Sequence, residues 1–149
     1  TKENIIAVII QTTDYLKLRT SSKVVINIQT GSLKEVFIPI NSALFSWVIE
    51  NVCKNAIDAI TGEGEIIIMV TENDQTAFID ISDNGKGIPK SAMKKIFKPG
   101  YTTKKTGWGL GLSLAKRIIE EYHNGKIFVR HSEIGKGSSI RIAMKKGIY

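Results

Sequence analysis

The feature that most constrains the fold of this 149-residue chain is the shortness of the turns between its strand-like segments. Three pairs of segments are joined in this way: 24–29 with 36–40, 65–71 with 76–82, and 126–131 with 138–144. Gly31-Ser32, Asn73-Asp74-Gln75 and Gly135-Lys136-Gly137 supply the turn residues. Because parallel neighbours need a crossover of a dozen or more residues, we expect a mixed or antiparallel sheet rather than a doubly wound one.

Helices are expected over residues 4–18, 41–61 and 110–122, and a shorter one near 91–96. The first carries apolar side chains at a spacing near 3.6 residues. Asn41 or Ser42 can cap the second, and Asn124-Gly125 can close the third. Together with the strands, these helices predict an α/β two-layer sandwich.

The composition excludes several classes of protein. No apolar run approaches the roughly 20 residues that span a bilayer. The net charge is +7, but the 21 Lys and Arg residues are scattered without a long stripe or interleaved aromatic residues. Nucleic-acid binding is therefore disfavoured against a small polyanionic ligand. Cys53 is the only cysteine, so no internal disulfide forms, and it falls on the apolar side of a helix, where a core role is expected. Because the chain lacks an initiator Met, we expect it to be a piece of a longer protein.

One face of the second helix combines amides with charged groups. At about 100° per residue, Asn51, Lys54, Asn55 and Asp58 fall within one arc, with Glu50 at its margin. Amide oxygens are hard ligands suited to Mg²⁺, and a carboxylate can orient or deprotonate an attacking group. A solvated polar face without a role is the alternative for this motif taken alone.

A glycine-containing turn follows the strand that ends at Ser82, with the sequence Asp83-Asn84-Gly85-Lys86-Gly87-Ile88-Pro89. The glycines allow the backbone to approach a flat ligand closely. A carboxylate beside Ile81 and Ile88 can accept a hydrogen bond from an exocyclic amino group, which would select adenine over guanine. An ordinary Asp-Asn-Gly turn is the alternative.

A basic loop and a glycine-rich helix start come next in the chain. Tyr101-Thr102-Thr103-Lys104 supplies hydroxyl and ammonium groups that could clamp phosphate oxygens. Gly107-Trp108-Gly109-Leu110-Gly111 leaves backbone N–H groups free to face an anion at a helix N-terminus. Neither a P-loop nor a dinucleotide fingerprint matches this order of glycines. We expect the loop to be flexible without ligand and ordered with it. A basic loop without a ligand is the alternative.

Together the four motifs resemble the N, G1, F and G2 boxes of the GHKL superfamily of ATPases. The chain from about Val24 to Met144 looks like the catalytic ATP-binding domain of a bacterial two-component sensor histidine kinase. The resemblance implies the Bergerat fold, in which a mixed, mainly antiparallel sheet packs against about three helices. It also implies that residues 1–20 are a connector helix from an absent dimerisation and phosphoacceptor domain, and that 21–149 form the catalytic domain.

The resemblance implies a role for each matching residue. Asn51 and Asn55 would face Mg²⁺ and the phosphates, and Glu50 would orient or activate the attacking imidazole. Asp83 would bind the adenine amino group, supported by Ser138 or Ser139, of which Ser139 is our choice. The whole nucleotide-binding set is expected to be Asn51, Asn55, Asp58, Asp83, Gly85, Gly87, Ile88, Tyr101, Thr102, Thr103, Lys104, Gly107, Gly109, Leu110, Gly111 and Ser139. Asp58, where many such kinases carry Lys, and Trp108, where a small residue is usual, depart from the family pattern.

The implied activity is transfer of the γ-phosphate of Mg·ATP to a histidine on the absent domain. His123 and His131 are expected to be surface or packing residues, because neither precedes an acidic residue as the family's acceptor does. The implied partners are ATP, the protein's own phosphoacceptor domain, a response regulator and a second copy in a homodimer, with no nucleic acid. The domain is expected to be cytoplasmic, in a parent that is either soluble or anchored in the inner membrane.

Two other functions remain open at this stage. Asn55-Ala56-Ile57-Asp58-Ala59 also looks like ATPases of the gyrase, mismatch-repair and chaperone type, in which ATP closes a dimer. Trp108 leaves room for a module that senses nucleotide and binds a partner without kinase activity.

Overall fold

The computed structural model describes residues 2–101 and 111–147. Along the chain the elements are β1 (Lys2–Asn4), α1 (Ile5–Arg19), β2 (Val24–Gln29), β3 (Phe37–Pro39), α2 (Ser42–Ala59), β4 (Gly64–Glu72), β5 (Thr76–Asp83), the 3₁₀ turns η1 (Lys90–Ala92) and η2 (Lys95–Phe97), α3 (Gly111–Arg117), the π turn η3 (Ile118–Tyr122), β6 (Lys126–Glu133) and β7 (Gly137–Lys145). Within these two ranges, no helix has the length and apolar character needed to cross a membrane.

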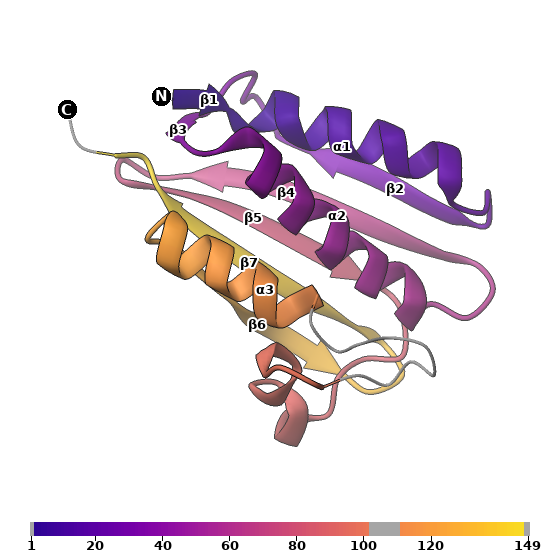
Figure 1. The fold of residues 1–149 in the computed structure, drawn as a ribbon. Coiled ribbons are helices and arrows are strands. Elements are labelled where there is room, and N and C mark those ends of the chain that lie inside the picture. The colour runs from indigo at the N-terminus through magenta and orange to yellow at the C-terminus, as the bar shows by residue number, and fades with distance from the viewer. Residues whose placement is uncertain (1, 102–110, 148–149) are drawn as a thin grey trace.

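The main sheet has five strands in the order β2-β4-β5-β7-β6. Only β2 and β4 are parallel, and every other neighbouring pair is antiparallel. The helices α1, α2 and α3 cover one face of this sheet (Figure 1). The expected α/β two-layer sandwich with a mixed, mainly antiparallel sheet is confirmed.

The expected pairing of 24–29 with 36–40 was wrong. β2 pairs with β4, and β3 instead forms a two-stranded ribbon with β1, in which Lys2 lies opposite Pro39. The parallel β2–β4 pair is possible because α2 supplies the long crossover that parallel strands require. Pro39 lacks an N–H group, and a short ribbon of this kind tolerates it. The helix expected near 91–96 is replaced by η1 and η2.

Helix α1 shares the core of the molecule. Ile5 and Ile9 are fully buried, and the Thr12 hydroxyl is hydrogen-bonded to that of Ser46 in α2 at 2.7 Å. Asn4 caps α1 by accepting from the backbone N–H of Ile6, and it also accepts from that of Val36. The role of residues 1–20 as a connector from a dimerisation domain stays a prediction.

Helix α2 packs its apolar side into the core of the molecule. The buried side chains of this helix are Phe45, Val48, Ile49, Val52, Cys53 and Ala56. Asn41 caps α2, its side-chain oxygen accepting from the backbone N–H of Leu44 at 3.0 Å. Burial raises the pKa of the Cys53 thiol to about 12, with a further contribution from the charge of Glu50. Cys53 is therefore a core residue, as expected.

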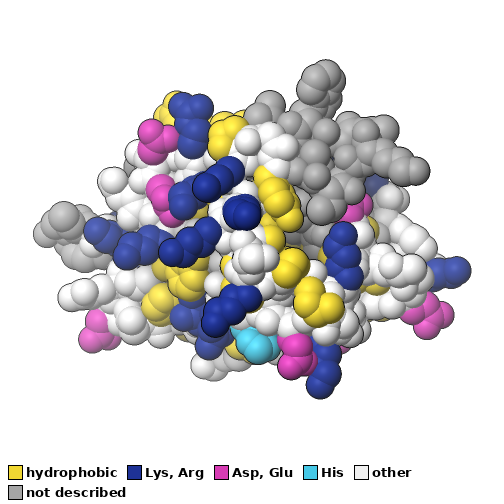
Figure 2. Space-filling view, turned by 90° about the horizontal axis from the view of Figure 1, so that it is seen from below, with side chains coloured by type: hydrophobic (Ala, Val, Ile, Leu, Met, Phe, Trp, Pro, Cys, Tyr) yellow, Lys and Arg dark blue, Asp and Glu magenta, His cyan; other side chains and the backbone are white. Residues whose placement is uncertain are grey.

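Basic side chains gather on one side of the molecule. Figure 2 shows this side, seen from below relative to Figure 1, with lysine and arginine spread over it and apolar side chains among them. Lys90, Lys94, Lys95 and Lys98 are all exposed in and around η1 and η2. A surface of this kind raises the local concentration of anionic ligands.

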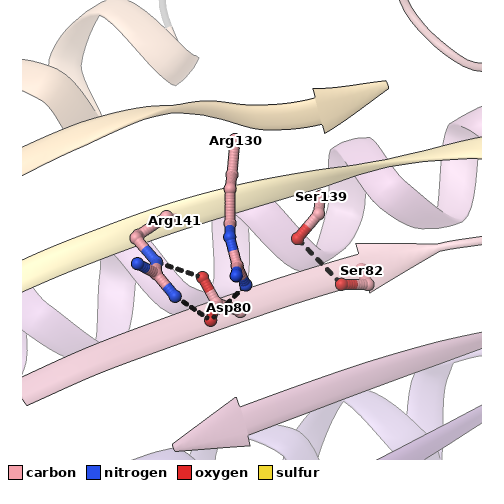
Figure 3. Close-up of polar contacts among 5 residues, drawn as sticks. All are labelled: Asp80, Ser82, Arg130, Ser139 and Arg141. Atoms are coloured by element: carbon pink, nitrogen blue, oxygen red, sulfur yellow. Dashed lines mark hydrogen bonds and ion pairs between the residues drawn. The ribbon is translucent and has the colours of Figure 1, made fainter. Parts of the chain in front are cut away.

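A buried ion pair lies on the face of the sheet that the helices leave uncovered. Asp80 is only 3% exposed, yet the pleat directs it away from the side of its buried neighbours Ile79 and Ile81. Arg141 of β7 donates to both carboxylate oxygens at 2.8 and 2.9 Å, and Arg130 of β6 donates at 3.2 Å (Figure 3). The cluster links β5, β6 and β7 through their side chains, and the two arginines neutralise the buried carboxylate.

Candidate functional site

A cavity of about 850 Å³ lies between α2, the turn after β5 and the start of α3. This volume is within the usual range for small-molecule sites. The lining residues are Trp47, Asn51, Val52, Lys54, Asn55, Ala56, Asp58, Ala59, Ile81, Asp83, Lys86, Gly87, Ile88, Pro89, Ile96, Tyr101, Gly111, Leu112, Leu114, Ile134, Ser138 and Ile140. The four motifs, spread over sixty residues of sequence, thus contribute to one cavity.

Most of the candidate site residues that the structure describes line this cavity. Those that line it are Asn51, Asn55, Asp58, Asp83, Gly87, Ile88, Tyr101 and Gly111. Glu50, Gly85 and Ser139 do not line it. Thr102, Thr103, Lys104, Gly107, Gly109 and Leu110 lie outside the described residues.

The two asparagines of α2 are oriented by the helix that carries them. The side-chain N–H of Asn51 donates to the Trp47 carbonyl, and that of Asn55 donates to the Asn51 carbonyl, each at 2.8 Å. These bonds to the preceding turn use the donor end of each amide and leave its oxygen as an acceptor. A Cβ added at Gly111 would lie 3.1 Å from the side-chain oxygen of Asn51, so the start of α3 reaches this amide.

Glu50 lies at the margin of the polar face, as its helical angle predicted. Its carboxylate pairs with the ammonium group of Lys54 at 3.7 Å. Lys54 lines the cavity and Glu50 does not. Glu50 is thus linked to the cavity through Lys54.

Asp83 lines the same cavity. One carboxylate oxygen accepts from the backbone N–H of Gly85 at 2.8 Å, and the other accepts from the Ser138 hydroxyl at 3.0 Å. Burial raises the pKa of Asp83, and these hydrogen bonds act in the opposite direction. Ile81 and Ile140 line the same cavity. A fixed carboxylate between apolar walls is suited to accept a hydrogen bond from a flat heterocycle.

The choice of Ser139 as the hydroxyl that supports Asp83 was wrong. Asp83 lies opposite Ser138 in the β5–β7 ladder, and Ser82 lies opposite Ser139. Because side chains alternate between the two faces of a strand, only Ser138 shares a face with Asp83. Ser139 instead accepts a hydrogen bond from the Ser82 hydroxyl at 2.9 Å on the other face (Figure 3).

The β6–β7 hairpin packs on the turn after β5. The Ser132 hydroxyl accepts from the backbone N–H of Ile88 at 2.6 Å, and the N–H of Gly135 donates to the Lys86 carbonyl at 2.8 Å. Gly87 has φ +81°, and a Cβ there would collide with the carbonyl oxygen of Glu133. Gly87 therefore permits both the turn and the close contact with the hairpin.

Several cavity residues were missed by the sequence analysis, among them Trp47, Leu112, Ile134 and Ile140. Trp47 lies one helical turn before Asn51, so the spacing that selected the asparagines could have found it. Ile134 could not be found in this way. It reaches the cavity only because the β6–β7 hairpin folds onto the turn after β5.

The geometry can be compared with known proteins. Residues 41–148 match the family model described as histidine kinase-, DNA gyrase B-, and HSP90-like ATPase. This chain belongs to that family. The expected GHKL membership and Bergerat fold are confirmed, and the family is one of ATPases, which makes ATP the ligand of the domain.

Individual relatives of this ATPase domain are histidine kinases. Sporulation kinase C of Bacillus subtilis (strain 168) is 36% identical over 119 residues, which cover 80% of this chain and 24% of that kinase. The chain therefore spans about a quarter of this curated relative. The nucleotide-free catalytic domain of the histidine kinase ThkA superposes with a TM-score of 0.87 at 25% identity, covering 98% of this chain and 97% of that one. A second ThkA structure, in complex with the response regulator protein TrrA, gives a TM-score of 0.82 at 25% identity, with 99% of this chain and 42% of that chain covered.

Proposed function

We propose that this ATPase domain is the catalytic domain of a sensor histidine kinase. It binds Mg·ATP in the cavity and presents the γ-phosphate to a histidine on a domain outside this chain. The observation that carries the proposal is the convergence of the Asp83 carboxylate and the Asn51 and Asn55 amides on one cavity. The kinase role is favoured over the gyrase and chaperone branches of the family by relatives such as the sporulation kinase and ThkA.

The adenine end of the proposed complex is at Asp83. Its carboxylate accepts a hydrogen bond from the exocyclic amino group, while Ile81, Ile88 and Ile140 enclose the faces of the base. Ser138 and the N–H of Gly85 hold the carboxylate in place. Guanine carries a carbonyl oxygen at the equivalent position, so this acceptor discriminates against it.

The phosphate end of the proposed complex is at Asn51 and Asn55. Their free amide oxygens suit Mg²⁺, a hard cation that binds oxygen ligands. When bound, Mg²⁺ neutralises charge on the phosphate oxygens. Lys104 and the glycines at 107, 109 and 111 are proposed to contact the phosphates, with Tyr101, Thr102, Thr103 and Leu110 beside them.

The remaining roles concern the attacking group and the partners. We propose that Glu50 orients or activates the incoming imidazole, since it lies one residue before Asn51.

The acceptor domain, a second copy in a homodimer and a response regulator are the proposed partners. ThkA forms a complex with such a regulator, which supports the last of these. The domain itself is proposed to be cytoplasmic.

A titration with ATP, with and without Mg²⁺, tests the proposal directly. The wild-type domain should bind Mg·ATP but not Mg·GTP. Asp83→Asn should bind Mg·ATP much more weakly, because an amide has a single acceptor oxygen for Gly85, Ser138 and the base. In the full-length protein, Asn55→Ala should abolish autophosphorylation. Absence of ATP binding at millimolar concentration, or an Asn55→Ala variant with wild-type rates, would refute the assignment. Nucleotide-dependent dimer closure without phosphohistidine would favour the gyrase-like branch.

A further inference from the structure

His123 connects two helices that meet at the nucleotide cavity. It follows the π turn η3, which continues α3, and its ring makes two hydrogen bonds to the backbone. The backbone N–H of Asn41 donates to Nε2 at 3.1 Å, and Nδ1 lies 2.8 Å from the Ile118 carbonyl. Because Nε2 accepts, Nδ1 must carry the proton and donate it. Only one tautomer of the neutral ring satisfies both contacts.

The two contacts join the ends of a pair of helices. Asn41 is the N-cap of α2, and Ile118 is the residue at which α3 passes into η3. At the other end of the pair, Gly111 of α3 meets Asn51 of α2 at the cavity wall. At about 1.5 Å per residue, Asn41 to Asn51 and Gly111 to His123 are helical stretches of similar length, about 15 and 18 Å. The helix pair is thus held by His123 at one end and forms part of the cavity at the other.

We propose that His123 is a positioning residue for the nucleotide site. By fixing the N-terminus of α2 to the end of α3, the neutral ring sets the separation between the Asn51 amide and the backbone at Gly111. This proposal rests on the proposed function, because it assigns His123 an effect on Mg·ATP affinity. Its structural part, the coupling of His123 to the two asparagines, can be tested without nucleotide.

If His123 positions the two helices, the affinity of the site for Mg·ATP depends on whether the His123 ring is neutral or charged. Protonation places a proton on Nε2, which then faces the N–H of Asn41, so that two donors oppose each other. The acidic side chains of η3 form solvent-exposed ion pairs with other residues: Glu120 with Lys116 at 3.8 Å, and Glu121 with Arg117 at 3.1 Å. The first turn of α2 carries no acidic residue, and the first residue of β6 is the cation Lys126. A charged His123 therefore cannot accept from Asn41, and water replaces this solvent-exposed contact with α2.

The matched variant for the test is His123→Gln. A glutamine amide supplies both an N–H donor group and a carbonyl acceptor, so it can take over both roles of the neutral ring, but it does not titrate. In the nucleotide-free domain, nitrogen-15 NMR from pH 8 to pH 5 should show the backbone amide of Asn41 and the side-chain amides of Asn51 and Asn55 shifting with a common midpoint. In His123→Gln this common transition should be absent. Over the same range, the Kd for Mg·ATP should rise about two- to threefold more in wild type than in the variant, the low end for one lost hydrogen bond, because this bond is exposed.

The comparison with His123→Gln separates this effect from that of Asp83, which titrates in both proteins. The proposal is overturned if the Asn41 amide follows the ring while the Asn51 and Asn55 amides do not. Equal losses of affinity in wild type and variant would also overturn it. If the domain binds no ATP, the proposed function fails, but the resonances still decide the coupling. If His123→Gln does not fold, the wild-type resonances decide it alone.

Discussion

At the scale of single residues, the orientation of the Asp83 carboxylate is fixed in part by the hydroxyl of Ser138. Ser138 is 8% exposed and donates to Asp83, whereas its neighbour Ser139 points to the other face of the sheet. The two serines are adjacent and chemically identical, so they form a natural pair of test positions. Any difference between their variants reports on the orientation of the side chain.

Ser138→Ala should weaken Mg·ATP binding about tenfold, because a hydrogen bond to a charged group contributes about 1.5–3 kcal/mol. Ser139→Ala should change the affinity less than about twofold, since it removes only the contact with Ser82. Isothermal titration calorimetry on both variants makes the measurement. Equal losses in the two variants would show that Ser138 does not support the ligand-binding carboxylate.

The raised pKa of Asp83 predicts opposite effects of pH on binding and on stability. The charged form is needed to accept from adenine, so affinity should fall as pH drops through the raised pKa. In the nucleotide-free domain, the folded state holds the proton more tightly than the unfolded state. The contribution of Asp83 to folding is therefore present below its unfolded pKa and is lost as pH rises through the folded pKa. Denaturant unfolding of wild type and Asp83→Asn between pH 3 and pH 7 should show this trend in the difference between the two free energies of unfolding.

At the scale of elements, the β6–β7 hairpin completes the cavity by packing on the turn after β5. Gly87 and Gly135 share φ +81°, but they differ in surroundings. A Cβ at Gly87 meets the backbone of Glu133, while a Cβ at Gly135 has nothing within 4 Å. A side chain at either position is strained by about 1–2 kcal/mol because of the left-handed backbone.

Gly87→Ala should therefore destabilise the domain by about 1–3 kcal/mol more than Gly135→Ala, the usual cost of forcing extra atoms into a packed region. It should also weaken Mg·ATP binding, because the hairpin must move away from the turn that carries Asp83. Chemical denaturation and ligand titration of both variants test this. Matching values for the two alanines would mean that the hairpin contact has no role in the site.

The helices of this domain were predicted from the sequence, whereas part of the strand pairing was not. The helices containing Ile9, Asn51 and Ala115 were predicted because helical periodicity and capping are local properties. The β1–β3 ribbon and the parallel β2–β4 pair were missed, since strand pairing is decided by contacts between distant segments such as Lys2 and Pro39. The motifs indicated the cavity correctly. They could not choose between Ser138 and Ser139, because that choice depends on the register of β5 against β7.

At the scale of the whole molecule, α1 and the sandwich form one hydrophobic core. Ile9 is fully buried in this core, while the adjacent Ile10 is 44% exposed. If the chain unfolds as one unit, a cavity created in α1 must lower the stability of the entire domain, nucleotide site included.

Ile9→Ala should accordingly lower the free energy of unfolding by about 2–5 kcal/mol, with a single transition for all probes. Ile10→Ala should cost less than about 1 kcal/mol, because much of its side chain is already in water. Circular dichroism and Trp47 fluorescence, followed in the same urea titration on a Trp108→Phe background, provide the two probes. If the urea transition followed at Trp47 has the same midpoint in wild type and in Ile9→Ala, α1 is an independent connector.

The burial of Cys53 has a practical consequence for such experiments. With a pKa of about 12, its sulfur stays protonated and enclosed at every pH at which the domain would be handled. Maleimide dyes react with accessible thiolates and should leave it untouched in the native protein. A fluorophore can therefore be attached at Leu18→Cys, a position that is 87% exposed, without first removing the natural thiol.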